Sequence, residues 1–219
     1  MKLTDLHTHT FLSDGILSPA ELVYRCKLNG LKAVALTDHA DYSNIKFVID
    51  SALRSSCELS VRYDIDVVAG VELTYIPPPD IERMVALARE MGARIVVVHG
   101  ETTAENVPHG TNLAAIRARC DILAHPGVLT SQQAAEASEK GVFIELTTRA
   151  GHRRGNAAVA EEALKNNCRM VINTDSHGPN DIMTKEKVER VLKDSSLSES
   201  DFEEIIKNSQ NLLNKAGRK

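Results

Sequence analysis

Apolar residues in this chain recur in short runs, and amphipathic stretches lie between the runs. Most of the runs are continuous rather than alternating, which is typical of strands covered on both faces. Seven runs are predicted as strands, over residues 3–6, 32–39, 66–72, 94–99, 121–125, 142–146 and 169–173. The stretches between them have apolar residues at helical spacing, and two further helices are predicted over 181–193 and 198–215.

Local signals mark where several elements begin and end. Residues 18–21 read Ser-Pro-Ala-Glu, which predicts a capping box with proline at the first helical position, and the helix should end at Asn29. Asp80 is placed to cap the helix over 81–91. The connection over 100–110 is longer than the usual two to six residues, so we expect a lid there.

Side chains that bind metals gather where the predicted strands end. Six of the eight histidines do so: His7, His9, His39, His99, His125 and His177. Three carboxylates join them: Glu72 and Asp175 at strand ends and Asp14 in the first turn. Successive side chains of a strand alternate between its faces, so His7 and His9 should point the same way.

Strands alternating with helices predict right-handed crossovers and a parallel sheet. In an open sheet, the loops after strands at opposite edges lie far apart, whereas in a barrel all carboxyl ends surround one opening. Ligand-type residues at the ends of six strands converge only in a barrel. We therefore expect one α/β domain over 1–219, a nearly closed barrel of seven strands with an extra C-terminal helix.

Nine candidate ligands exceed what one catalytic ion uses, which is about three protein ligands and an open position. We therefore expect two or three divalent ions, with Glu72 as a plausible bridge between them. Imidazole and carboxylate without thiolate suits Zn, Mn or Fe and does not choose among them.

Composition and charge limit the classes of substrate and binding partner that we expect. The chain has 219 residues, 42% of them hydrophobic, and a formal charge of −4 without a long basic run, which argues against nucleic acid and for a small substrate. Its four cysteines form no close pair, as in proteins of a reducing compartment. The start of the chain lacks the pattern of a signal peptide, and no apolar run reaches the ~18 residues of a membrane span. We expect a cytoplasmic protein that does not cross a membrane.

Taken together, several short motifs resemble the PHP family, the polymerase-associated domains and histidinol phosphate phosphatases. They are His7-Thr8-His9, Ser13-Asp14-Gly15, Thr37-Asp38-His39, Gly70-Val71-Glu72, His99, Ala124-His125-Pro126 and Thr174-Asp175-Ser176-His177. The resemblance covers essentially the whole chain and implies a distorted seven-stranded TIM-like barrel. In some members a histidine stands where this chain has Asp14.

The resemblance also implies a trinuclear site that hydrolyses phosphoesters. It assigns His7, His9, Glu72 and Asp175 to one ion, Glu72, His99 and His125 to a second, and Asp14, His39 and His177 to a third. A small phosphomonoester, such as histidinol phosphate or a nucleotide, would be attacked by a hydroxide that bridges two ions. Glu72, His125 and Asp175 are thus also the candidate catalytic residues.

Arg149, in the loop after the sixth strand, is a further catalytic candidate because a guanidinium matches phosphate oxygens; an exposed, solubilising loop is the alternative. Arg153 and Arg154 of the same loop are weaker candidates. His109 and His152 lie within loops, and we expect them at the surface or behind the ligands, with contact to the substrate as the alternative.

Two other functions fit the same residues. The cluster would also serve a metal-dependent amidohydrolase, although no lysine directly follows a strand to act as a carboxylated bridge. A regulatory metal-binding domain without catalysis is the third possibility, and the presence of all nine ligand types counts against it.

Overall fold

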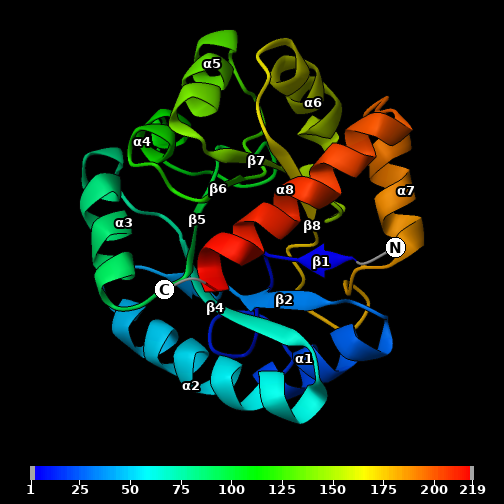
Figure 1. Cartoon of the computed structure of the whole chain (residues 1–219). Coiled ribbons are helices and arrows are strands. Elements are labelled where there is room, and N and C mark those ends of the chain that lie inside the picture. Colours follow the sequence, from blue (N-terminus) through cyan, green and yellow to red (C-terminus); the bar gives the residue numbers. More distant parts are fainter. Residues whose placement is uncertain (1–2, 218–219) are drawn as a thin grey trace.

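A parallel sheet forms the centre of the computed structural model, which describes residues 3–217 (Figure 1). The strands follow one another in chain order: β1 (Thr4–Asp5), β2 (Ala33–Leu36), β4 (Asp66–Leu73), β5 (Ile95–His99), β6 (Ile122–Ala124), β7 (Phe143–Thr147) and β8 (Met170–Asn173). A short additional strand, β3 (His39–Ala40), pairs with β4, so the run predicted over 32–39 is divided in two. The expected α/β barrel of parallel strands is confirmed.

The ring closes through the segments that follow its first and last strands. Thr8 and Ser176 form a parallel bridge. The backbone N–H of His9 donates to the carbonyl of Ser176 at 2.8 Å, and the N–H of Asp175 donates to the carbonyl of His7 at 3.0 Å. The residues after β1 and after β8 therefore lie side by side at the carboxyl end of the barrel.

Helices surround this ring (Figure 1). They are α1 (Pro19–Leu28), α2 (Ile45–Tyr63), α3 (Ile81–Glu90), α4 (Thr111–Arg117), α5 (Ser131–Lys140), α6 (Asn156–Lys165), α7 (Lys185–Asp194) and α8 (Glu199–Gly217). Two short 3₁₀ turns, η1 (Pro78–Asp80) and η2 (His152–Gly155), precede α3 and α6. Most of the buried apolar residues pack between the helices and the outer face of the sheet.

Helix α8 closes the amino-terminal end of the barrel, and in Figure 1 it runs across the ring of strands. Its Leu212 and Ala216 join the apolar residues inside the ring. Asn208 donates to the carbonyl of Met170 at 3.0 Å, and Lys215 pairs with Asp121 at 2.6 Å, at the starts of β8 and β6. Because α8 fills the amino-terminal end, a site inside the barrel can open only at the carboxyl ends of the strands.

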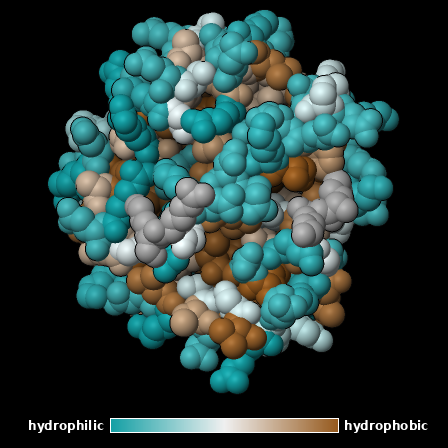
Figure 2. Space-filling model, in the orientation of Figure 1, coloured by the Kyte–Doolittle hydropathy of each residue, from teal (hydrophilic) through white to brown (hydrophobic). Residues whose placement is uncertain are grey.

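The surface on the α8 side is mostly hydrophilic, with hydrophobic patches between polar side chains (Figure 2). Among the residues that the structure describes, no helix combines the length and the apolar character needed to cross a membrane.

Helix α7 begins four residues later than predicted. The side chain of Thr184 caps it by accepting the N–H of Lys187, and α7 starts at Lys185. Asp181, the expected start, instead accepts the backbone N–H of His177 at 3.0 Å. The carboxylate of Asp181 therefore stabilises the loop after β8 and does not cap α7.

Two predicted caps also differ. Ser18 accepts the N–H of Glu21 as expected, but the carboxylate of Glu21 pairs with Arg25 and so completes no capping box. The side chain of Asp80 makes no capping bond to α3 and accepts the hydroxyl of Tyr42 at 2.6 Å.

Candidate metal centre

The interior of the barrel changes from apolar to polar toward the carboxyl ends of the strands. Val68 on β4 and Phe143 on β7 belong to the apolar interior. Glu72 and Glu145 lie on the same faces of these strands, four and two residues further on, because side chains alternate with a period of two. Both carboxylates are buried. Charged groups at such depth require partners of opposite charge.

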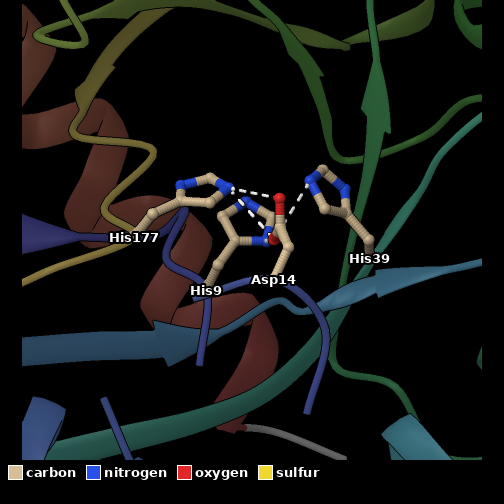
Figure 3. A group of neighbouring side chains, drawn as sticks. All are labelled: His9, Asp14, His39 and His177. Atoms are coloured by element: carbon tan, nitrogen blue, oxygen red, sulfur yellow. Dashed lines mark hydrogen bonds and ion pairs between the residues drawn. The ribbon is translucent and has the colours of Figure 1, made fainter. Parts of the chain in front are cut away.

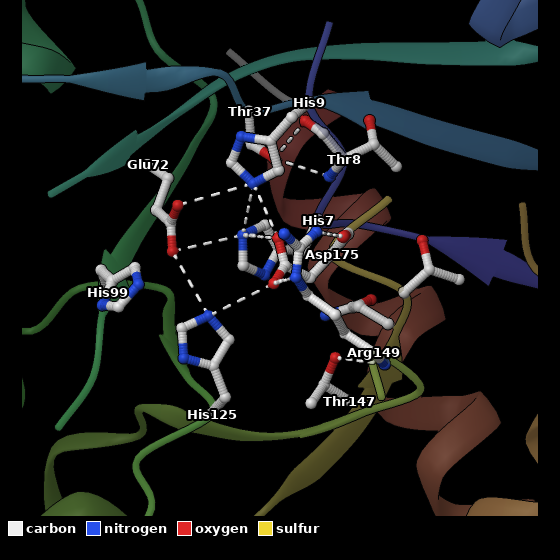
Figure 4. Close-up of polar contacts among 12 residues, drawn as sticks. His7, Thr8, His9, Thr37, Glu72, His99, His125, Thr147, Arg149 and Asp175 are labelled. Carbon is white, nitrogen blue, oxygen red and sulfur yellow. Dashed lines mark hydrogen bonds and ion pairs between the residues drawn. The ribbon is translucent and has the colours of Figure 1, made fainter. Parts of the chain in front are cut away.

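The first group of candidate ligands contains two histidines from the segment after β1 and two acids (Figure 4). Nε2 of His7 is 3.2 Å from Oε1 of Glu72, and Nε2 of His9 is 3.0 Å from Oδ1 of Asp175. The Nε2 atoms of the two histidines are 3.1 Å apart. All four side chains therefore face one point.

The second group lies on the other side of Glu72, where His99 and His125 face the same carboxylate. One ligand atom from each of the three residues lies within 4.8 Å of the others. Nδ1 of His99 is 3.1 Å from the carbonyl of Gly100, so it donates there and leaves Nε2 free to bind an ion. Nε2 of His125 is 3.8 Å from Oε1 of Glu72.

The third group is nearer the solvent and combines His9, Asp14, His39 and His177, whose side chains point toward one another in Figure 3. Oδ1 of Asp14 lies 3.1 Å from Nε2 of His177 and 3.6 Å from Nε2 of His39. The side chain of Asp14 is 56% exposed, whereas Glu72 is fully buried. The structure thus brings all nine predicted ligands together at one opening.

The donors fit divalent metal ions. Among residues 3–217, Nδ1 of His9, Nδ1 of His125 and Oε1 of Glu72 are buried without a hydrogen-bond partner. Buried polar atoms are normally satisfied, and groups without a partner call for an ion, a water or a functional reason. Facing imidazole nitrogens and carboxylate oxygens without thiolates are the donor set of Zn, Mn or Fe.

The electrostatics of the first group are strongly perturbed. Burial disfavours the charged form of His7, but the carboxylates of Glu145 and Glu72 outweigh it and hold the pKa of His7 well above its usual value. Burial raises the pKa of Glu72, and His7 and His39 reverse this and bring it well below the usual value. Burial and the charge of His39 bring the pKa of His9 well below its usual value.

The pKa of Asp175 shifts in the opposite direction to that of Glu72. Burial raises the pKa of Asp175 to about 7. Burial and the nearby His99 hold the pKa of His125 well below its usual value, so this ring is neutral, the form that binds metal. Such opposed shifts within one cluster are typical of functional sites.

Carboxylates behind the ligands hold them in place. Oε2 of Glu145 accepts Nδ1–H of His7 at 2.8 Å and the amide of Asn173 at 2.9 Å. This bond fixes the tautomer that leaves Nε2 of His7 for an ion. Asp38 is buried and accepts the N–H of Thr10 and the hydroxyl of Ser13, both at 2.7 Å, so it anchors the turn that carries the third group's acid.

Two of the predicted ligands have strained backbones. His125 has a φ of 26° and Asp175 a φ of 52°, in the left-handed region that favours glycine. Such conformations cost of order 1–3 kcal/mol and persist at sites where the surroundings impose them.

A cavity of about 250 Å³ opens above the three groups. Arg149 and Asp175 line it together: Nε of Arg149 is 3.4 Å from Oδ2 of Asp175, and Nη1 donates to its carbonyl at 2.9 Å. Arg153 and Arg154 are not among the residues that line it. Of the three arginines, Arg149 therefore lies nearest the ligands.

Sequence reasoning missed Glu105 in this cavity, whereas His152 was considered and its burial beside the ligands was one of the expected placements. His152 is only 5% exposed and stacks on His125 with ring centroids 4.4 Å apart. Glu105, from the long loop after β5, lies 3.3 Å from Nε2 of His99 and 3.4 Å from Nε2 of His152. Its contact with His99 lowers the pKa of Glu105 to about 2. The signal available for His152 was that it shares a strand-end loop with Arg149.

The other loop residues serve structure. His109 is fully exposed, as expected, and contacts Glu101 at 3.2 Å. Glu101 also accepts the backbone N–H groups of Gly110 and Asn112, which ties the ends of the long loop together.

A parallel barrel with histidines and acids gathered at its carboxyl end defines a metal-dependent hydrolase. The chain belongs to the PHP domain family, whose model matches residues 5–217. Members of this family are metal-dependent phosphoesterases, and the expected class of enzyme is thereby confirmed.

Three relatives illustrate the match. The uncharacterized protein MJ1295 of Methanocaldococcus jannaschii is 43% identical over 204 residues, which cover 92% of this chain and 94% of that protein. A chain in the structure of archaeal ribonuclease P with mature tRNA has a TM-score of 0.71 at 16% identity, covering 96% of this chain and 90% of that one. The third is a chain from the structures of YwqE from Bacillus subtilis and CpsB from Streptococcus pneumoniae, which are metal-dependent tyrosine phosphatases. It has a TM-score of 0.63 at 16% identity, covering 97% of this chain and 95% of that one. At 16% identity, the two structural matches show that the fold is shared.

Proposed function

We propose that the protein hydrolyses small phosphomonoesters, such as histidinol phosphate-like compounds or nucleotides, with three divalent ions bound at the barrel mouth. The observation that carries this proposal is the shared cavity of Arg149 and the candidate ligands. Its volume of about 250 Å³ admits a phosphoryl group with a small part of its ester. Metal-dependent phosphatases share the fold, which supports the same chemistry here.

The distances between the nine candidate ligands suggest how they divide among three ions. We assign His7, His9, Glu72 and Asp175 to the first ion, Glu72, His99 and His125 to the second, and Asp14, His39 and His177 to the third. The third ion should bind most weakly, because the side chains of Asp14, His39 and His177 are 56%, 24% and 14% exposed. Zn, Mn and Fe all suit these donors.

Bound divalent ions supply a water with a pKa near 7 and positive charge for the phosphoryl oxygens. The residues of this chain hold and orient the reactants. Glu72 contacts both inner groups and so fixes their separation. The guanidinium of Arg149 presents N–H donors to the cavity and orients the phosphoryl oxygens.

A substrate panel tests the proposal. The purified protein, loaded with Zn, Mn or Fe, is assayed against phosphomonoesters, amides and lactones, with released phosphate as the main readout. Phosphate release supports the proposal. Hydrolysis of amides or lactones alone would indicate an amidohydrolase, and bound metal without turnover a regulatory domain.

Variants test the assignment. Glu72→Ala and His125→Ala should abolish turnover and reduce the number of bound ions, while circular dichroism shows an intact fold. His109→Ala is the matched control, because this histidine is fully exposed at the same end of the barrel. A metal-depleted variant with full activity would contradict the scheme.

A further inference from the structure

His152 lies in the cavity, yet none of the three ligand groups includes it. Its Nε2 is directed at acids: Oε1 of Glu105 at 3.4 Å and Oδ2 of Asp175 at 3.8 Å. His152 belongs to none of the groups whose nitrogens would share an ion with the acids they face, so a bare lone pair on its Nε2 would be repelled by these oxygens. The surroundings of Nε2 therefore favour a ring with the proton on this atom.

The contact at the other ring nitrogen fits the same tautomer. Nδ1 of His152 is 2.6 Å from the hydroxyl oxygen of Thr102. That oxygen already accepts the backbone N–H of Ala104 at 3.2 Å. A hydroxyl has one hydrogen to donate, and donating it to Nδ1 leaves the ring proton on Nε2.

The loops that carry these residues are packed closely, so the ring is held in a fixed place. A Cβ at Gly127 would lie 2.2 Å from the carbonyl of Glu101, and a Cβ at Gly155 would lie 2.7 Å from the carbonyl of Gly127. The backbone around Gly127 thus touches both the loop of Thr102 and the loop of His152.

We propose that His152 donates a hydrogen bond from Nε2 to a phosphoryl oxygen of the substrate, and that Thr102 is the positioning residue that fixes this tautomer. The inference rests on the proposed phosphoesterase function. Arg149 and His152 lie in the same loop, and both face Oδ2 of Asp175. Nε of Arg149 is 3.4 Å from this oxygen and Nε2 of His152 is 3.8 Å from it. Together they present two N–H donors beside the ion-binding acid, the arrangement that a phosphoryl group needs.

The first test does not depend on turnover. Long-range ¹H–¹⁵N correlation spectra of the Zn-loaded protein report which nitrogen of each histidine is protonated, and the His152 signals are those lost in His152→Gln. We expect protonated Nε2 in the wild type and in Thr102→Ser, and a mixture of tautomers in Thr102→Val. A proton on Nδ1 in the wild type, or no response to Thr102→Val, would overturn the inference.

The second test uses kinetics on whichever phosphomonoester the wild type hydrolyses. Loss of one preorganised donor lowers kcat by about 10²-fold in comparable sites, and we expect this of His152→Ala with the number of bound ions unchanged. His152→Gln keeps a donor near the position of Nε2 and should recover part of the loss. His109→Gln should match the wild type.

The outcomes separate the two proposals. If the wild type releases no phosphate from any ester, the proposed function fails, and the spectra still decide the tautomer. If the wild type is active and His152→Ala retains its kcat, the role of His152 is wrong. Loss of a bound ion in His152→Ala would make His152 a metal ligand and also overturn the inference.

Discussion

Replacing Glu145 with glutamine should weaken metal binding about tenfold while the barrel stays folded. Glu145 accepts Nδ1–H of His7 at 2.8 Å and the amide of Asn173 at 2.9 Å, both through Oε2. Glutamine has the same shape, and its carbonyl oxygen keeps both bonds. What is lost is the negative charge behind the imidazole.

The size of the effect follows from that charge. A hydrogen bond to a charged group contributes about 1.5–3 kcal/mol, and one between neutral groups about 0.5–1.5 kcal/mol. The difference of about 1–1.5 kcal/mol corresponds to about tenfold in affinity. Glu145→Ala removes the acceptor altogether and should cost up to about 100-fold, as orienting carboxylates do elsewhere.

Competition with a chromophoric chelator for Zn measures the affinity, and elemental analysis counts the ions. Glu139→Gln, on the exposed face of α5, is the matched control. Unchanged affinity in Glu145→Gln would refute the reasoning. The stoichiometric loss of one ion would instead make Glu145 a ligand, which the proximity of His7, His125 and Glu145 permits.

Three further predictions concern stability. Burial raises the pKa of Asp5 to about 6, so this group alone should lower the free energy of unfolding by about 3 kcal/mol as the pH rises from about 4 to about 6. Denaturant titrations of the wild type and of Asp5→Asn should differ by this amount over that range. Gly127→Ala places a Cβ 2.2 Å from the carbonyl of Glu101 and should lower the unfolding free energy by about 2 kcal/mol more than Gly30→Ala does. Both glycines have a positive φ, but a Cβ at Gly30 meets nothing within 4 Å. Removing metal with a chelator should lower the melting temperature by about 5–10 °C, and calorimetry should show its recovery on adding Zn or Mn, because ions at about 100 times their Kd contribute about 2.7 kcal/mol.

The nine-residue cluster was predictable because its members, except Asp14 in the first turn, lie at or just after predicted strands. Each predicted strand brings its end to the same rim, and side-chain alternation decides which residues face inward. His99, for example, follows a run of four apolar residues, so both its position and its direction were set by β5. Residue type alone then marked them as candidate ligands.

The residues that sequence reasoning missed depend on irregular backbone. Glu105 lies in a loop without regular periodicity, and its contact with His152 joins positions 47 residues apart. Similarly, Asp80 reads as a cap from its local sequence, but the hydroxyl of Tyr42 binds it from another loop. Such contacts depend on how loops pack and leave no local pattern.

Closure of the barrel and assembly of the site use the same contacts. Asp5, at the end of β1, accepts the hydroxyl of Thr174 at 2.5 Å, and Leu6 donates its N–H to the side chain of Asn173 at 2.9 Å. These buried bonds join the first strand to the last and so bring His7 next to Asp175. Opening this seam separates candidate ligands of the first group, and an ion bound between them would oppose the opening. An ion at this position would link metal binding to ring closure thermodynamically, each strengthening the other by the same free energy.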